Sequence, residues 1–375
     1  MKRIKMVLFL SLAMIFLASC NKEYRNKGET KKEITKKDYI KYEDTFYETF
    51  DTIVSFSCYT TSEDEFEGYK KIVRDNFKKY NDIFDNYKDY PGVVNVKTIN
   101  DNPGTEVIVP KELFDLIKFS KESYKNISDR TNIAMGKVTM YWSDLRDYFE
   151  DGDGNEDREE DFSILTSEEL KNLNGKASVD MIELNEKNLS VKLLNEDTKI
   201  DLGAVAKGYT TELVSDLLEE KGLKNFIISA GGNVKAVGQP QDGNRTKFGV
   251  GIQNPDNAIG LSDEKIKDVL FINNLSCVTS GDYQRAFELD GKTYHHLIDP
   301  DTFYPKNNYR SVTVVTEDSG LADYLSTCLF LLDLDDAKAL LSKHEDVGAY
   351  FILSDGSTFI TENLKDKVES LGAKN

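Results

Sequence analysis

The chain has 375 residues, a formal net charge of −18 at pH 7 and a pI near 4.8. This acidic balance argues against nucleic acid or an anionic membrane surface as a partner of the folded part. The length is enough for one large bilobed domain or for two domains. An acidic protein that binds a phosphate ligand must gather positive charge locally or use a metal ion.

The first 20 residues have the pattern of a targeting segment. Three basic residues among the first five precede an apolar run that is shorter than a typical transmembrane helix. The run ends in Leu-Ala-Ser-Cys, which resembles the lipobox of bacterial lipoproteins. This resemblance implies that residues 1–19 are a signal peptide, that Cys20 carries a lipid such as palmitate, and that the protein is anchored outside the cytoplasmic membrane. A plain secretory signal with a chance cysteine is the alternative.

Residues 20–42 are rich in Lys and Glu and contain few apolar side chains. That composition is typical of a disordered tether. The other three cysteines, Cys58, Cys277 and Cys328, are odd in number and have apolar neighbours. We therefore expect buried free thiols there, with neither a disulfide framework nor a zinc site.

The first half of the chain predicts a strand and then several helices. Periodicity indicates a strand over 46–59 and helices over 64–87 and 110–126, whereas 132–142 is mixed and holds the only tryptophan, Trp142. The acidic run 151–161 is similar to a calcium loop, but Glu156 stands where an EF-hand needs Gly. We expect a solvated acidic insertion.

The most informative stretch runs from Asp201 to Gly238. After a strand expected over 192–200, an apolar stripe at helical spacing predicts a helix. Its members are Val205, Tyr209, Leu213 and Leu217, with Val214 and Leu218 beside them. Gly222 is placed to end this helix, and a buried strand over 226–230 leads directly into Gly231-Gly232. The N-terminus of such a helix suits a phosphate, to which Lys207 adds a full charge. The spacing matches neither the dinucleotide fingerprint nor the Walker loop, so an ordinary crossover is the alternative.

The last third of the chain predicts a strand over 278–282, a hairpin about Asp290-Gly291, a strand over 310–316 and a helix over 322–331. His295 and His296 point to opposite faces of their strand, so at most one faces a given site. Asp323 and Thr327 share one face of their helix. Such a pair suits a hard cation such as Mg²⁺ that also binds water and phosphate oxygens. A helix cap with a packed Thr is the alternative.

Five motifs follow one another in a fixed order: DLGAVAKGY from Asp201, AGGN, TSGDY, YHHLIDP and ADYLST. Together they resemble the motif set of the FAD:protein FMN transferases, the ApbE family, from about Thr45 to the C-terminus. The resemblance implies an α+β fold over residues 43–370. We expect mixed, largely antiparallel sheets packed with helices in an ApbE-like (T-fold-like) bilobed domain.

The resemblance also implies roles for individual residues. Positions matching FAD contacts or the flavin pocket are Asp201, Lys207, Ile298, Tyr87, Phe50, Ala134, Met135 and Gly136. The implied Mg²⁺ ligands are the carbonyl of Ala204 and the side chains of Asp323 and Thr327, with Ser326 where some relatives have Asp. His296 matches the histidine proposed for catalysis in the family. Asp282 is the candidate carboxylate that orients His296, because the motifs that contain these two residues are close together in the sequence. Phe50 and Asn132 replace the Met and Asp of many relatives.

The implied activity is Mg²⁺-dependent transfer of FMN from FAD to a Thr or Ser hydroxyl of a target protein, with release of AMP. Acceptor sites of the family resemble D-G-x-[ST]-G-A-[ST]. The resemblance implies two classes of target, flavinylated subunits of membrane redox complexes and extracellular electron-transfer flavoproteins, and the sequence does not name the acceptor. Residues 355–358 begin like such a site but continue with Phe-Ile, which argues against self-flavinylation.

Three other functions are open at this point. Water in place of the target hydroxyl would give an FAD hydrolase that forms FMN and AMP. A flavin-binding lipoprotein without turnover would not require the pair formed by Asp323 and Thr327. A generic solute-binding lipoprotein predicts two similar lobes, and the sequence shows no such repeat.

Overall fold

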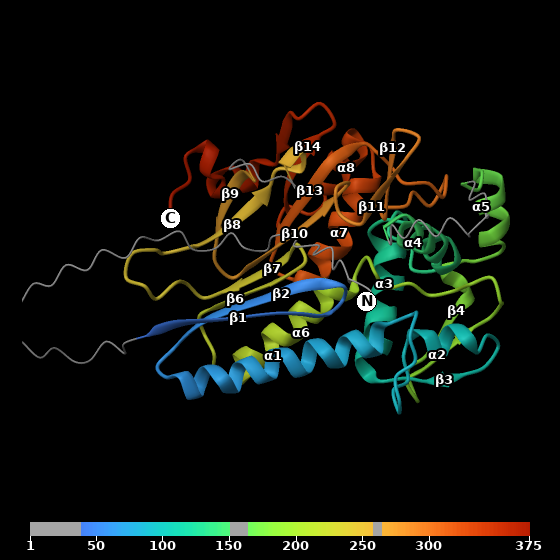
Figure 1. Ribbon diagram of the computed structural model, residues 1–375, viewed down its shortest axis with the longest axis horizontal. Helices are drawn as coiled ribbons and strands as arrows, with labels where there is room; N and C mark the ends of the chain where they lie inside the picture. Colours follow the sequence, from blue (N-terminus) through green and yellow to red (C-terminus); the bar gives the residue numbers. More distant parts are fainter. Residues whose placement is uncertain (1–38, 151–163, 258–264) are drawn as a thin grey trace, which may run out of the picture.

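The computed structural model describes residues 39–150, 164–257 and 265–375. At the centre of this part lies an antiparallel sheet of eight strands, ordered β1-β2-β6-β7-β10-β13-β14-β15 (Figure 1). Its strands are β1 (Ile40–Thr49), β2 (Thr52–Thr60), β6 (Phe226–Ala230), β7 (Asn233–Val237), β10 (Leu275–Gly281), β13 (Tyr309–Thr316), β14 (Gly348–Leu353) and β15 (Thr358–Ile360).

The expected signal peptide, Cys20, almost all of the tether and the acidic run 151–161 lie outside the described residues. None of the helices in the described part combines the length and the apolarity that crossing a bilayer requires.

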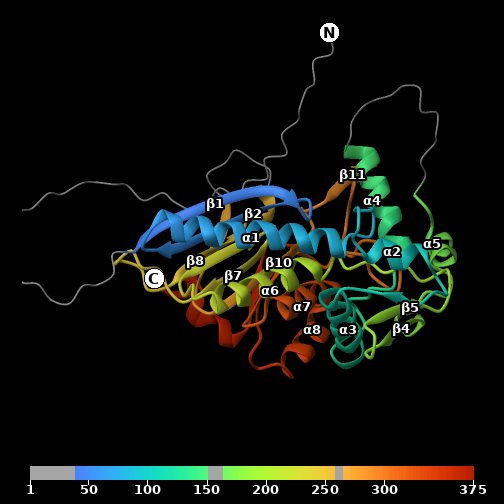
Figure 2. The same cartoon turned by 90° about the horizontal axis from the view of Figure 1, so that it is seen from below.

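Three helices lie side by side on one face of the large sheet: α1 (Glu63–Phe84), α6 (Ala206–Glu220) and α7 (Ser319–Leu331) (Figure 2). Helix α1 begins where the Ser62 side chain accepts a hydrogen bond from the Glu65 N–H, which satisfies one free backbone donor. Nearly every residue of α7 is buried, since α7 contacts both the sheet and α6. The main core therefore lies between these helices and the sheet.

The opposite face of the sheet is covered by the hairpin β8 (Phe248–Gln253) and β9 (Ile266–Ile272) and by C-terminal 3₁₀ helices over Glu362–Lys367 and Glu369–Leu371. Alternate side chains of β14 point to opposite faces of the sheet and so belong to different cores. Ala349 and Phe351 belong to the main core, whereas Tyr350 and Ile352 belong to the second.

The remaining elements lie mostly at one end of the large sheet (Figure 1). They are α2 (Val96–Asp101), α3 (Lys111–Asn126), α4 (Gly136–Glu150), α5 (Ser167–Asn174), α8 (Leu334–Leu341), a three-stranded sheet of β3 (Val107–Ile108), β5 (Ser190–Leu193) and β4 (Ile182–Asn185), and the hairpin β11 (Ala286–Leu289) and β12 (Lys292–His295). Mixed helices and antiparallel sheets confirm the predicted α+β class.

The prediction of one strand over residues 46–59 is wrong, because the segment turns back on itself between β1 and β2. Phe50 and Asp51 form the turn with φ angles of 53° and 48°. Two successive positive φ angles characterise the type I′ hairpin turn, which usually uses Asn or Gly. Neither Asn nor Gly occurs here, and Asp51 alone is a weak turn signal. The predicted strand over 192–200 likewise ends early, at Leu193.

Helix α6 is present as predicted, and Val205, Val214 and Leu218 of the expected stripe are fully buried, but the rest of the stripe is not. Tyr209, Leu213 and Leu217 are only half-buried. The fully buried positions include Thr211, Val214, Ser215 and Leu218. Small residues occupy this face because α6 packs closely against α7.

Several local predictions are confirmed. The hairpin turns at Asp290-Gly291, Gly222 has a left-handed φ of 97°, and residues 322–331 lie within α7. The three described cysteines are buried and free.

Candidate active site

A cavity of about 540 Å³ opens among the β1–β2 turn, α4, the β11–β12 hairpin, the start of α6 and α7. This volume is typical of a ligand site. Its wall brings together ten of the residues singled out in the sequence: Phe50, Tyr87, Met135, Asp201, Ala204, Lys207, His296, Ile298, Asp323 and Thr327. These residues are spread over some 280 positions of the chain, so only the folded structure makes them one site.

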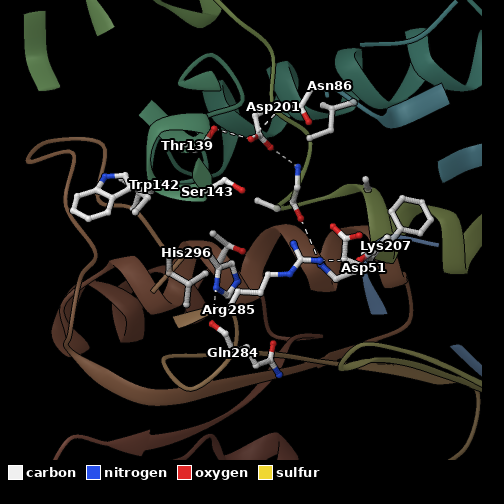
Figure 3. Close-up of a pocket in the computed structure, with 18 of the residues that line it drawn as sticks. Asp51, Asn86, Thr139, Trp142, Ser143, Asp201, Lys207, Gln284, Arg285 and His296 are labelled. Carbon is white, nitrogen blue, oxygen red and sulfur yellow. Dashed lines mark hydrogen bonds between the residues drawn. The ribbon is translucent and has the colours of Figure 1, made fainter. Parts of the chain in front are cut away.

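The loop before α6 is held in shape by Asp201. Its carboxylate accepts hydrogen bonds from the Gly203 N–H at 2.7 Å and from the Thr139 hydroxyl at 2.6 Å (Figure 3). The Lys207 side chain then enters the cavity from the first turn of α6. Burial lowers the pKa of Lys207, and the negative charge of Asp323 opposes that shift.

Asp323 of α7 lies directly beside the first turn of α6. Its Oδ2 accepts a hydrogen bond of 2.8 Å from the Gly208 N–H. A Cβ on Gly208 would lie 2.4 Å from the Asp323 Cβ and 2.2 Å from the Ser319 carbonyl oxygen, so only glycine permits this approach of the two helices. Burial raises the pKa of Asp323, while Lys207 opposes the shift.

Asp323, Thr327 and Ala204 all line the cavity and offer a carboxylate, a hydroxyl and a carbonyl. Such oxygen donors fit Mg²⁺, which usually binds one or two carboxylates and completes its shell with water and phosphate. Among the described residues no cluster of three or more His, Cys, Asp or Glu side chains could hold a metal ion. A cation here would therefore take further ligands from water or a bound substrate.

Ser326 lies away from this donor set. Its hydroxyl is fully buried, bonds the Ser280 hydroxyl at 2.8 Å and donates to the Asp323 carbonyl at 2.9 Å. Ser326 lies one position before Thr327, about 100° away around the helix, and its hydroxyl turns toward Ser280 of β10. Ser326 is not among the residues that line the cavity, so the structure does not support its assignment as a metal ligand.

His296 follows β12 and points into the cavity. Its Nδ1 lies 3.0 Å from the Gln284 carbonyl oxygen (Figure 3). A carbonyl can only accept, so Nδ1 carries the proton and Nε2 keeps its lone pair. Burial first, and then the charges of Arg285 and Lys207, lower the pKa of His296 well below its usual 6.5. The imidazole is thus neutral and able to act as a base.

His295 has a different environment, as its neighbouring position on the strand predicts. Its Nε2 lies 3.1 Å from Asn307 Oδ1, and its ring packs edge-on against Phe330. Burial lowers the pKa of His295 to about 4. It serves packing, whereas His296 faces the cavity centre.

The pairing of Asp282 with His296 is contradicted. Asp282 accepts a hydrogen bond from Arg310 Nε at 2.8 Å and does not line the cavity. The ring of His296 is oriented instead by the Gln284 carbonyl. Proximity in the sequence misled here, because Asp282 follows β10 and turns toward the neighbouring strand β13, which carries Arg310.

The flavin-pocket assignments divide into two groups. Phe50, Tyr87, Met135 and Ile298 line the cavity, but Ala134 and Gly136 do not. Ala134 is buried, and the Gly136 N–H donates to the Lys199 carbonyl at 2.9 Å. Tyr87 is 44 % exposed, while burial of its hydroxyl and the nearby Asp201 raise its pKa to about 12.

Sequence reasoning missed Arg285. In Figure 3 its guanidinium lies between His296 and Lys207, in the middle of the cavity. Nη2 donates to the Phe50 carbonyl at 2.7 Å. The available signal was an arginine two positions after the end of the TSGDY motif in an acidic chain.

Comparison with known proteins agrees with this architecture. The ApbE family model matches residues 50–351. The FAD:protein FMN transferase of Klebsiella pneumoniae (strain 342) is 31 % identical over 248 residues, which cover 66 % of this chain and 70 % of that protein. The FAD:protein FMN transferase of Haemophilus influenzae is 29 % identical over 269 residues, covering 70 % of this chain and 73 % of that protein.

A solved structure supports the same relationship. The crystal structure of the ApbE protein from Thermotoga maritima superimposes with a TM-score of 0.72 and 25 % identity, covering 88 % of this chain and 98 % of that one. The family match, the two relatives and the shared fold agree with the five ordered motifs. The chain therefore belongs to the ApbE family.

Proposed function

We propose that this protein transfers FMN from FAD to a Thr or Ser hydroxyl of target proteins, forming a phosphoester and releasing AMP. One observation carries the proposal: a neutral histidine, a lysine and the oxygen donors of Asp323 and Thr327 face one cavity. That combination supplies a base, a counter-charge and a place for a divalent cation. The curated relatives named above are FAD:protein FMN transferases.

In the proposed reaction His296 acts as the general base. Its Nε2 accepts the proton of the target hydroxyl while the hydroxyl oxygen bonds to the FMN-side phosphorus. The bond from that phosphorus to the bridging oxygen breaks, and AMP leaves with this oxygen. Lys207 offsets the negative charge that develops on AMP. Mg²⁺ held by Asp323, Thr327 and the Ala204 carbonyl would neutralise pyrophosphate charge as a Lewis acid.

The same residues would serve an attacking water, which makes release of free FMN and AMP an outcome to be measured. The chain from Asn21 onward is mixed with FAD, Mg²⁺ and a target domain that bears D-G-x-[ST]-G-A-[ST]. The intact mass of the target should increase by one FMN, and the increase should vanish with a chelator. FAD consumption without an adduct would favour the hydrolase. Tight binding without FAD consumption would contradict both enzymes.

We further propose that Cys20 is lipidated and that the protein acts at the outer side of the cell membrane. The lipobox-like sequence and its basic start support this location. Cys20→Ser should move the protein from the membrane fraction to the soluble fraction and remove lipid from its N-terminal peptide. Unchanged membrane association of this variant would contradict lipid anchoring.

A further inference from the structure

Arg285 differs from every other arginine that the structure describes. Each of the others forms an ion pair with a carboxylate: Arg74 with Asp44, Arg130 with Asp301, Arg146 with Asp147, Arg245 with Asp242 and Arg310 with Asp282. Within the described residues Arg285 has no carboxylate oxygen within 4.0 Å, although it lies at the centre of an acidic protein's cavity. Its charge therefore lacks a protein counter-charge in direct contact.

An unpaired guanidinium in a cavity wall is costly unless a ligand compensates for it. Burial lowers the pKa of Arg285, and the nearby negative charge of Asp51 opposes that shift without reaching ion-pair distance. The hydrogen bond that the structure gives this side chain joins Nη2 to the Phe50 carbonyl. A guanidinium has five N–H donors in a rigid fork, so the remaining donors are available to an anion in the cavity.

The position of Arg285 indicates which part of a pyrophosphate it would meet. Its neighbour Gln284 provides the carbonyl that holds His296, so the fork lies on the side of the base (Figure 3). Lys207 lies on the other side, where the carboxylate of Asp323 is the main charge acting on it. Two cations thus approach one space from opposite directions.

We propose that Arg285 is a catalytic residue that binds the FMN-side phosphate, the group that is transferred, while Lys207 serves the departing AMP. This inference rests on the proposed function and deepens it. The fork would contact non-bridging oxygens of the phosphorus under attack. It would hold them in place as the hydroxyl approaches and offset the charge that spreads over them in the transition state.

A purely structural role makes a different prediction. The hydrogen bond to Phe50 also ties the segment just before β11 to the β1–β2 turn, where Phe50 and Asp51 have positive φ angles. If this bond were the whole role of Arg285, its loss would lower thermal stability or FAD affinity and leave the transfer step unchanged. The two roles therefore separate in a comparison of kcat with FAD binding.

The test uses Arg285→Gln, Arg285→Ala and Arg285→Lys in the otherwise unchanged chain, with Arg245→Gln as the matched control. Unlike Arg285, Arg245 pairs with a carboxylate, that of Asp242, and it lies outside the cavity wall. We expect Arg285→Gln to lower kcat for FMN transfer by about 100-fold or more, with less than a tenfold change in the Kd for FAD. Arg285→Lys should keep an intermediate rate, and millimolar guanidinium ion should partly restore Arg285→Ala.

Wild-type kcat in Arg285→Gln, or a loss confined to FAD affinity, would overturn the assignment. If Arg285→Gln fails to fold, rescue of Arg285→Ala and the rate of Arg285→Lys decide the question. Failure of the proposed function is distinguishable, because the wild type would then form no FMN adduct. FAD cleavage to free FMN that keeps the same dependence on Arg285 would still support the phosphate contact.

Discussion

Two groups of charged residues each include one residue of helix α6 and have opposite arrangements. The open group consists of Lys207, Arg285 and Asp323, which line the cavity and form no ion pair within 4.0 Å among the described residues. The closed group consists of Glu212 and Lys235, which are 3.0 Å apart. Lys235 also donates to the Glu317 carbonyl at 2.6 Å, and Glu212 accepts from the Ser319 N–H at 2.7 Å.

The closed group is complete without a ligand and joins α6, β7 and the start of α7. In the open group, Lys207 lies one to two turns of α6 before Glu212. The charges of this group have no ion-pair partner in the described part of the protein and can bind a substrate. The comparison shows that neighbouring charged residues on one helix, Lys207 and Glu212, can serve function and stability separately. Buried charges that the protein itself pairs maintain the fold, whereas those it leaves unpaired mark the site of chemistry.

Removing Asp323 tests the open group most severely. Asp323→Ala deletes the only carboxylate of the implied Mg²⁺ donor set, so transfer should fall by at least about 1,000-fold. Intact mass of the target measures the rate. Asp318→Ala on the same helix is the matched control, since it removes only an N-cap to the Leu321 N–H and should cost about 1 kcal/mol of stability. Comparable activity of the two variants would contradict the metal site.

Removing Glu212 tests the closed group. Glu212→Gln leaves Lys235, whose side chain is 9 % exposed, as a buried charge without its partner. The free energy of unfolding should fall by about 3 kcal/mol, measured by urea unfolding. Glu220→Gln, at the exposed end of the same helix, should change it by less than about 0.5 kcal/mol. A strong loss of FMN transfer in folded Glu212→Gln would contradict the assignment of the closed group to stability alone.

Acidification tests a third buried environment near the cavity. Because burial lowers the pKa of His295 from 6.5 to about 4, the folded state binds fewer protons than the unfolded state between these values. Stability is therefore lost as the pH falls through this window, by about 2 kcal/mol between pH 7 and 5. His296 should add to the loss when no ligand is bound.

Urea unfolding at several pH values measures this dependence. His295→Gln should flatten it. A pH dependence that is the same in wild type and His295→Gln would mean that His295 titrates normally in the fold.

The smallest effect is expected outside the open group, at Asp282. Asp282→Asn removes the ion pair with Arg310 but leaves the Gln284 carbonyl on His296. Transfer should stay within about threefold of wild type, with a stability loss of about 1 kcal/mol. The acid limb of the rate profile should not move. A fall as large as that of Asp323→Ala would restore Asp282 as the residue that orients the base.

Local patterns in the sequence predicted the elements that frame the cavity. Hydrophobic period and caps located α6 and α7, and Asp290-Gly291 located the β11–β12 hairpin. The ordered motifs also indicated His296, Lys207 and Asp323, all of which line the cavity. These features depend on residues close together in the chain, where spacing and backbone preference largely determine the outcome.

The tertiary structure alone decided which charges are paired. Asp282 meets Arg310, Glu212 meets Lys235, and Arg285 meets no carboxylate among the described residues, although nothing in their spacing distinguishes them. It likewise turned Ser326 toward β10. An ion pair depends on the distance between side chains from separate elements, and sheet order and helix packing set that distance after the local structure has formed.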